Sequence, residues 1–418
     1  MEQWHKNLYL AWLAQILTLS GFGFILPFIP LFIRELGVTE PSSLKLWAGL
    51  TAGAPGLVMA VAAPFWGMVS DRFGRKVMIV RALASSMIIA VALGFAPTVQ
   101  VVLALRALQG LFSGSVTAAA TLVAVGTPRV HLTRALGLMG SSTFIGSSLG
   151  PLVGGVSADL FGFRFSFFVG AGLIAVGLVL VVLFLQEPGG EPSARRRLAA
   201  PPPRAGRPPV RELLSLPFLL LFAVIFLLRF ARAQPTAFIP LYVAELRAGS
   251  LGAAVAGDAA ITGMIMAGSA AVAAAAGVTV ARLGDRCNKL WLIAVSSGLG
   301  ALVALPTFFA PNLALFALFF IASGFVLGSV QPFAQSYLSV HSARARHGVL
   351  FGLQNTVGGL GFGLGPLAAS WISVAATTRH VFLSYTLAFA SITLLMLVAR
   401  LLGRRFTRAL PRPPQGGT

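Results

Sequence analysis

The sequence predicts an all-α membrane protein that crosses the bilayer twelve times. Of its 418 residues, 57% are hydrophobic and only 10% are charged, and the mean hydropathy is +0.87. A soluble domain usually carries about 25% charged residues, so this chain has too few to cover a soluble fold. One spanning helix needs about 20 apolar residues, and the apolar content suffices for about twelve.

Intervals without charged residues locate these helices along the chain. One runs between Lys6 and Arg34, and a longer one between Lys289 and Arg344 accommodates two helices around a turn at 310–312. We therefore expect twelve helices starting near residues 8, 46, 77, 99, 135, 165, 215, 256, 290, 312, 349 and 380.

The basic residues predict the orientation. Of the 31 Lys and Arg residues, 23 fall on the side that holds both termini and only five on the opposite side. Because basic segments resist translocation, both termini are expected in the cytoplasm and the protein in the cell inner membrane. The net charge of +20 is thus a topology signal, and no nucleic-acid partner is expected. The other three basic residues, Arg106, Arg229 and Arg232, lie within predicted helices.

The two halves of the chain repeat each other. Residues 28–32 (FIPLF) recur at 238–242 (FIPLY), and 110–115 (GLFSGS) correspond to 324–329 (GFVLGS). Such repeats predict two pseudo-symmetric six-helix halves that rock around a substrate site near the midplane. The stretch between them is rich in Pro, Gly and Arg, which is typical of a flexible linker. The expected divisions are an N-terminal half at 1–186, a cytoplasmic linker at 187–214, a C-terminal half at 215–403 and a cytoplasmic tail at 404–418.

Three motifs indicate a family. The loop at 67–76 reads GMVSDRFGRK, residues 106–110 read RALQG, and residues 146–155 read GSSLGPLVGG. With these motifs the chain resembles the major facilitator superfamily, and within it the twelve-helix drug:proton antiporter branch that includes bacterial multidrug-resistance efflux proteins.

The resemblance implies roles for the residues that match it. Arg106 would be the buried basic residue associated with proton coupling. A kinked, tightly packed hinge in the fifth helix would comprise Gly146, Gly150, Pro151, Gly154 and Gly155. A conformational latch on the cytoplasmic side would comprise Gly67, Asp71, Arg72, Gly74, Arg75 and Lys76. The corresponding residues in the second half would be Asp285 and Arg286.

A substrate cavity would lie between the halves. Arg229 and Arg232 share one helix face, and an unpaired Arg at a helix centre costs about 2.5–3.5 kcal/mol, so these two either bind carbonyl groups or face the cavity. No acid lies at a helix centre, which favours neutral, zwitterionic or anionic amphiphiles over cations. Asp258 near the outer rim could carry the proton if a closed state buries it. The other expected cavity residues are Gln15, Phe22, Gln109, Phe238, Gln331, Gln335, Gln354 and Asn355.

The remaining composition excludes several classes of protein. A single cysteine, Cys287, rules out a disulfide framework, and the five histidines form no metal-ligand spacing. With no cofactor motif, phosphate loop or nucleophile–base pair, an enzyme is not expected. We expect a monomer whose partners are a small-molecule substrate, protons and the lipid bilayer. It would be a secondary active transporter, and its expected function is proton-coupled efflux of hydrophobic drugs or other amphiphiles. The alternatives are a carrier of organic anions or metabolites that uses Arg229 and Arg232, and a non-transporting membrane scaffold.

Overall fold

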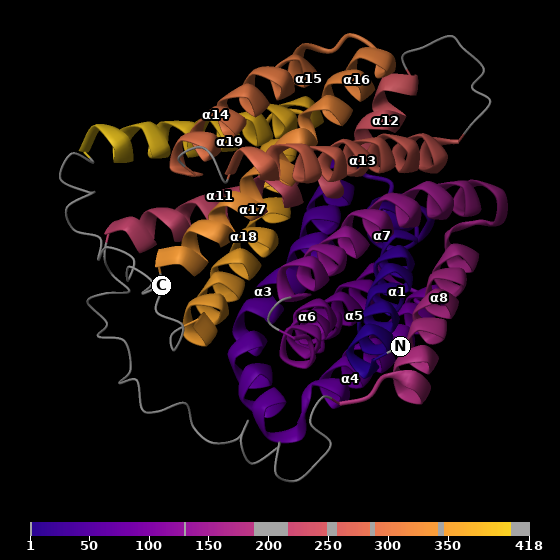
Figure 1. Ribbon diagram of the computed structural model, residues 1–418. Coiled ribbons are helices and arrows are strands. Elements are labelled where there is room, and N and C mark those ends of the chain that lie inside the picture. Colours follow the sequence, from indigo (N-terminus) through magenta and orange to yellow (C-terminus); the bar gives the residue numbers. More distant parts are fainter. Residues whose placement is uncertain are drawn as a thin grey trace.

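The chain folds into two helical bundles that lie side by side (Figure 1). The computed structural model describes residues 2–128, 131–187, 216–248, 257–284, 289–341 and 347–402. These residues contain 12 helical segments long and apolar enough to cross a membrane. The predicted fold class is therefore confirmed, and the helices begin within a few residues of the expected positions.

The first bundle contains six spans, two of which are broken within the membrane. Pro27, which lacks a backbone N–H, lies in a short 3-10 turn that interrupts the first span. Gly114 has a φ of 117° at the break in the fourth span, a backbone conformation that favours glycine. The elements are α1 (Gln3–Gly23), η1 (Leu26–Phe28), α2 (Ile29–Glu35), α3 (Pro41–Phe73), α4 (Arg75–Gly94), α5 (Val99–Leu111), α6 (Ser115–Gly126), α7 (Leu132–Phe161) and α8 (Phe163–Phe184).

The second bundle repeats this plan, including its breaks. The seventh span is interrupted at Ala237 and Phe238, just after Pro235, and the tenth at Gly324. The elements are α11 (Leu216–Thr236), α12 (Ile239–Ala248), α13 (Asp258–Gly284), α14 (Lys289–Ala304), α15 (Pro306–Phe309), α16 (Leu313–Ser323), α17 (Phe325–His341), α18 (His347–Ala375) and α19 (Thr378–Leu402).

The repeated glycines make the same contact in both bundles. A Cβ atom built on Gly110 would lie 2.3 Å from the carbonyl oxygen of Pro55, and one on Gly324 would lie 2.3 Å from that of Ser269. Both pairs are separated by the same shift along the sequence, so the internal repeat is a repeat in space. Small residues at these positions let helix backbones approach closely.

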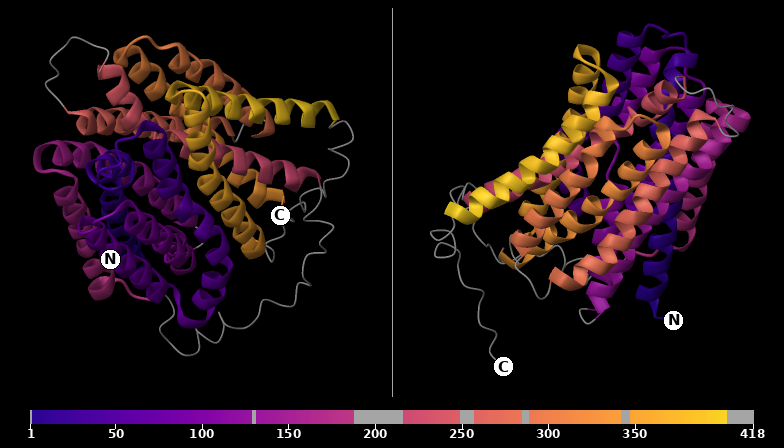
Figure 2. Two further views of the ribbon diagram at one scale, coloured as in Figure 1. Left: turned by 180° about the vertical axis from the view of Figure 1, so that it is seen from behind. Right: turned by 90° about the horizontal axis from the view of Figure 1, so that it is seen from above.

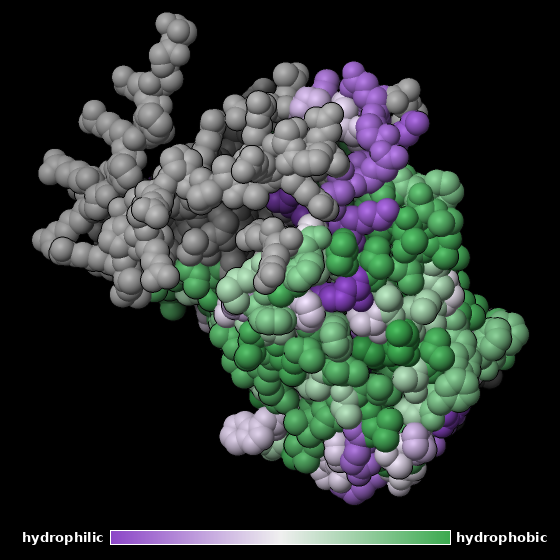
Figure 3. All heavy atoms as spheres, turned by 90° about the horizontal axis from the view of Figure 1, so that it is seen from below, coloured by the Kyte–Doolittle hydropathy of each residue, from purple (hydrophilic) through white to green (hydrophobic). Residues whose placement is uncertain are grey.

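Because the spans alternate in direction, the bundle has two ends. We call the end where α1 begins the near side and the end where α2 finishes the far side. The right-hand view in Figure 2 shows the bundles close together at one end and diverging toward the end marked N. Most buried apolar side chains fall into two clusters, one centred on each bundle, and the first also includes Phe238 and Leu241 of the second bundle. Large apolar side chains are exposed on many helices, and Figure 3 shows them as a broad hydrophobic surface between hydrophilic rims.

Candidate functional site

On the far half of the molecule, the bundles meet along a seam between α3 and α18. A Cβ atom on Gly53 would lie 2.5 Å from the carbonyl oxygen of Gly363, and one on Gly56 would lie 2.5 Å from the backbone nitrogen of Gly363. Toward the midplane, a Cβ atom on Gly359 would lie 3.1 Å from that of Ala60. Backbones this close leave no passage between α3 and α18 on the far half.

A second seam joins α7 of the first bundle to α13 of the second. A Cβ atom on Gly155 would lie 2.2 Å from the carbonyl oxygen of Ala259, and one on Gly263 would lie 2.1 Å from that of Pro151. Nearer the midplane, the Ser148 hydroxyl donates to the carbonyl of Ala267 at 3.1 Å. The two seams together close the far side.

Closer to the near end, the same helix faces lack close partners among the described residues. Helical periodicity places Val61 and Met68 on the α3 face of Leu57, which contacts α18, yet they are 81% and 67% exposed. On α7, Gly137 and Gly140 share the face of Pro151, but a Cβ atom on either would meet nothing within 4 Å. In the part of the chain that the structure describes, the bundles are thus closed on the far side and open on the near side.

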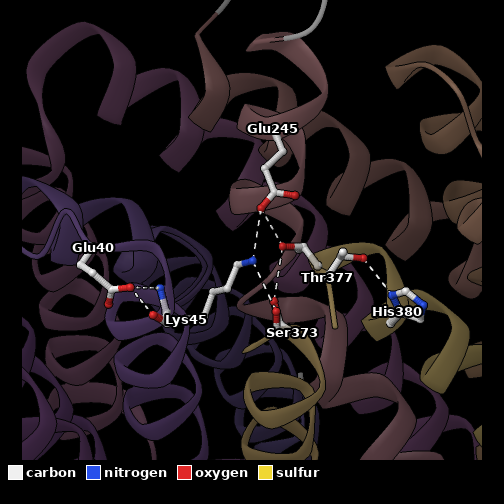
Figure 4. Close-up of polar contacts among 8 residues, drawn as sticks. Glu40, Lys45, Glu245, Ser373, Thr377 and His380 are labelled. Atoms are coloured by element: carbon white, nitrogen blue, oxygen red, sulfur yellow. Dashed lines mark hydrogen bonds and ion pairs between the residues drawn. The ribbon is translucent and has the colours of Figure 1, made fainter. Parts of the chain in front are cut away.

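A polar cluster links the bundles at the far end of the first seam (Figure 4). The Lys45 ammonium lies 3.8 Å from a carboxylate oxygen of Glu245 and donates to the carbonyl of Ser373 at 3.4 Å. The Ser370 hydroxyl donates to the carbonyl of Lys45 at 2.9 Å, and the Thr378 hydroxyl donates to Glu245 at 2.6 Å. Lys45 of α3 is therefore held by groups on α12 and α18.

Two further acids lie at the far end of the second seam. The Asp159 carboxylate accepts from the backbone N–H groups of Ala259 and Ala260, at 3.4 and 2.7 Å, and so caps the start of α13. An anion here is favoured by the positive end of the helix dipole. Asp258, the expected proton carrier, lies at this far end and forms an ion pair with Arg247 at 2.5 Å.

These far-end contacts of Lys45, Glu245 and Asp159 were not foreseen as functional. A signal was present in the sequence, because the far side carries only five basic residues. In so charge-poor a region, an acid and a base on different halves are candidates for a pair.

Arg106 of α5 is buried against α3 and is only 4% exposed. Its Nε–H donates to the carbonyl of Thr51 at 3.0 Å, and its Nη1 donates to the Gln109 side chain. Pro55 lacks the N–H that would otherwise bond to Thr51 within the helix, so this carbonyl is available to Arg106. The R-x-x-Q-G motif therefore packs as a unit on the Pro55 turn of α3.

Arg229 and Arg232 lie on α11 in different surroundings. The Arg229 side chain lies against α18, where a Cβ atom on Gly361 would be 3.2 Å from its Cβ. Arg232 lies within electrostatic range of Tyr385 on α19, whose hydroxyl is 3.0 Å from that of Ser323. Among the described residues, neither guanidinium has a hydrogen bond or an ion pair.

The other expected cavity residues are distributed over both bundles. Gln15 donates to Thr143 at 3.0 Å and so joins α1 to α7, and Phe238 is fully buried against the first bundle. Gln234, which is fully buried with both side-chain polar atoms unpaired, is a further candidate. Gln109 and Gln354 are buried, Phe22 and Gln331 are half-buried, Asn355 is exposed, and the side chain of Gln335 lies outside the described residues.

The expected hinge packs against α1. A Cβ atom on Gly146 or Gly150 would lie 2.5–2.6 Å from an α1 residue, and one on Gly154 would lie 2.7 Å from Phe24, which follows α1. Gly155 and the carbonyl of Pro151 face α13. This helix thus contacts its own bundle on one side and the other bundle on the opposite side.

The expected latch is described only in part. Gly74 has a φ of 93°, and the backbone N–H groups of Arg75 and Lys76 donate to the Glu187 carboxylate at 3.0 and 2.7 Å. These contacts stay within the first bundle. Asp285 and Arg286 lie outside the described residues, as do the side chains of Asp71 and Arg72 and the surroundings of Gly67.

Two pseudo-symmetric bundles, sealed at one end and apart at the other, define a membrane transporter that works by alternating access. The family model of the Major Facilitator Superfamily matches residues 11–268 and 250–417. The chain belongs to this superfamily and is a multi-pass secondary transporter of small molecules.

Relatives and solved structures agree with this assignment. The chain is 32% identical to "Multidrug resistance protein MdtG" of Salmonella arizonae, over 91% of each chain. It is 31% identical to the protein of the same name from Proteus mirabilis, over 91% of this chain and 92% of that one. A bacterial homolog of the human lysosomal transporter Spinster, in an inward-facing and occupied conformation, superposes with a TM-score of 0.75 at 16% identity, over 97% and 98% of the chains. The human organic anion transporter MFSD10 (TETRAN) superposes with a TM-score of 0.69 at 17% identity, over 95% of this chain and 100% of that one.

Proposed function

We propose that this transporter exports hydrophobic or amphiphilic drugs, driven by protons that move inward. The main observation that supports this proposal is the pair of seams, which close the far side and leave the near side open. That is one of the two access states that an exporter needs. The relatives named for multidrug resistance and the antiporter motifs support this direction of transport.

In this proposal the near side faces the cytoplasm and both termini lie there. The excess of Lys and Arg in the loops on that side supports the assignment. The membrane is the cell inner membrane, and the working unit is a monomer. The structure then corresponds to the state that collects substrate from the cytoplasm or the inner leaflet.

The proposed substrates are neutral, zwitterionic or anionic amphiphiles. Every Asp and Glu in the described part of the chain lies near a helix end, whereas Arg106, Arg229 and Arg232 lie within spans. A cationic drug would therefore find repulsion and no countercharge at the midplane.

Proton coupling in this proposal involves Arg106 and Asp258. Arg106 would hold α5 on the Pro55 turn, and Asp258 would exchange Arg247 for a proton when the far side opens. Everted vesicles test the coupling. Uptake of a fluorescent neutral drug should begin on respiration and stop when a protonophore collapses the gradient. Uptake that survives the protonophore contradicts proton coupling but leaves transport itself intact.

A second candidate is a carrier of organic anions. It is favoured by the guanidinium groups of Arg229 and Arg232, which have no described partner and could bind a carboxylate or sulfonate. The double variant Arg229→Gln/Arg232→Gln should abolish anion transport if this reading is right, and leave neutral-drug export largely unchanged. Loss of both activities would mean that the two residues serve the fold.

A further inference from the structure

A groove lies between the near-side ends of α1 and α8, away from both seams. Its volume is about 480 Å³. Its walls are largely exposed, with Leu183 at 67% and Phe184 at 55%. The groove is lined by Gln3, Lys6, Tyr9, Leu10, Leu13, Leu183, Phe184 and Gln186.

The shape of the groove is fixed by a buried asparagine. Asn7 is 5% exposed, and its side chain makes two hydrogen bonds to the backbone of Gln186. Its amide donates to the Gln186 carbonyl at 2.8 Å and its oxygen accepts from the Gln186 N–H at 3.1 Å. These bonds hold the end of α8 against the second turn of α1 and so determine the spacing between the two helices at the groove.

The lining changes from polar to apolar along the helix axis. Lys6 and the two glutamines lie at the open end, Tyr9 follows, and Leu10 and Leu13 lie deeper. The eight residues from Lys6 to Leu13 rise about 10 Å along α1. A phospholipid has the same polarity sequence over a similar depth, from its phosphate to its upper acyl chain.

The one charged side chain in the described lining of the groove is the basic Lys6. Among the described residues, the Lys6 ammonium has no hydrogen bond or ion pair. Of the described acids at this end, Glu187 accepts from the start of α4 and Glu2 accepts from the Trp4 indole, and neither forms an ion pair with Lys6. A free ammonium at a membrane surface attracts anionic headgroups.

We propose that this groove binds one anionic phospholipid. Its phosphate would lie at Lys6, with Gln3 and Gln186 as additional donors, and an acyl chain would run along the leucine wall. The lipid would fasten α1 to α8 at the near side and would not enter the transport path.

The test uses the full-length protein in a neutral detergent. Thermal unfolding is followed while phosphatidylglycerol, or phosphatidylcholine with the same acyl chains, is added. A lipid that binds only the folded protein raises the unfolding temperature as it is titrated. We expect saturable stabilisation by phosphatidylglycerol and a bound stoichiometry of one by native mass spectrometry. Equal stabilisation by both lipids would overturn the proposal.

Two variants and one soluble probe locate the site. Lys6→Gln should weaken the affinity for phosphatidylglycerol about fivefold, the contribution of one basic residue near an anionic surface. Arg34→Gln, an exposed basic residue at the other end of the same span, should leave it unchanged. Leu13→Trp should weaken it by filling the groove without changing its charge. Glycerol phosphate should not compete, because it lacks acyl chains. Unchanged affinity in both Lys6→Gln and Leu13→Trp, or full competition by glycerol phosphate, would contradict the lipid site.

Discussion

At the scale of single residues, two buried or capping groups explain how charge is tolerated at the ends and in the centre of this fold. Arg106 is satisfied by a carbonyl that Pro55 leaves free and by the neighbouring Gln109. Glu40 performs the corresponding task at the surface, where its carboxylate accepts from the backbone N–H groups of Ser42 and Ser43 and begins α3. In each case a backbone group that lacks a helical partner is paired with a charged side chain.

Replacement of Arg106 should impair transport more than folding. Arg106→Lys keeps the charge, but a lysine ammonium lacks the planar set of N–H donors with which Arg106 binds both Thr51 and Gln109. A hydrogen bond to a charged group contributes about 1.5–3 kcal/mol to stability. We expect drug export to fall at least about tenfold, measured as uptake into everted vesicles at matched protein level. Gln109→Ala, which removes one of the two partners, should have a smaller effect. Full export by Arg106→Lys would show that its hydrogen bonds are dispensable.

The Glu40 cap should give a defined pH dependence. Its hydrogen bonds to Ser42 and Ser43 lower the pKa of the carboxyl from 4.5 to about 2. A depressed pKa means that the stabilisation is complete above pH 4.5 and is lost as the pH falls toward 2. Glu40→Gln should therefore unfold at a lower temperature than the wild type at pH 7, and this difference should shrink below pH 4.5. Glu35→Gln, at an exposed acid nearby, serves as the control. A difference that is the same at pH 7 and pH 2.5 would contradict the assigned cap.

At the scale of helices, glycine determines where the bundles can meet. On α7, Gly155 is in contact with the other bundle, whereas Gly140, on the same general face, is open. One helix therefore carries a closed contact and an unused contact, and switching between states requires exchanging them.

Alanine at these two glycines should have different effects on the closure of the far side. Gly155→Ala would place a methyl group against the Ala259 carbonyl, and overpacking of this kind costs about 1–3 kcal/mol in the far-closed state. In a Cys287→Ser background, a Ser370→Cys reporter in the first seam should then react faster with a membrane-impermeant thiol reagent added from the far side. Gly140→Ala should leave that rate unchanged or lower it. Equal rates in both variants would mean that the glycine contact does not determine the state.

At the scale of the whole molecule, the far side is held by contacts between halves, whereas the described residues make no such contacts at the near end. Lys45 with Glu245 and Asp159 with the start of α13 act at the two ends of this closure. They join residues far apart in sequence and on different halves in the far-closed arrangement, so their strength should bias the access equilibrium.

Charge exchange at Lys45 and Glu245 should shift that equilibrium reversibly. Lys45→Glu places two acids together, and partly exposed pairs of this kind contribute about 0.2–1 kcal/mol, up to about a fivefold change in population. We expect a Val61→Cys reporter on the open near side to label more slowly in Lys45→Glu and to recover in Lys45→Glu/Glu245→Lys. A swap variant that behaves like the single variant would exclude a direct role for this pair.

Much of this arrangement could be predicted from the sequence, because long apolar segments with few charges identify membrane helices. The twelve spans, the class of fold and the repeat of Gly110 and Gly324 followed from hydropathy and spacing. The start of α3 was placed about one turn too late, since Pro41 at the first helical position and the Glu40 cap add no hydropathy.

The contacts between halves could not be predicted in the same way. Periodicity indicates that Gly155 packs closely against something, but not that its partner is the Ala259 carbonyl of the other bundle. Lys45 and Glu245 read as ordinary loop charges, because their pairing depends on the state in which the bundles are docked. The sequence identifies the arginines within the spans. Only the structure shows that the Arg106 guanidinium is hydrogen-bonded, whereas the Arg229 guanidinium has no hydrogen bond among the described residues.

The sealed seams also have an electrical consequence. In the proposed orientation, water enters the near half from the cytoplasm, so the membrane voltage falls mainly across the closed far half instead of the full bilayer. Moving one elementary charge through that drop is worth about 2.3 kcal/mol per 100 mV. A substrate held at the midplane therefore already lies near cytoplasmic potential, and its passage outward, together with the returning proton, accounts for most of the voltage sensitivity of the cycle. Efflux of a neutral compound and efflux of an anion should then respond differently to the same membrane potential.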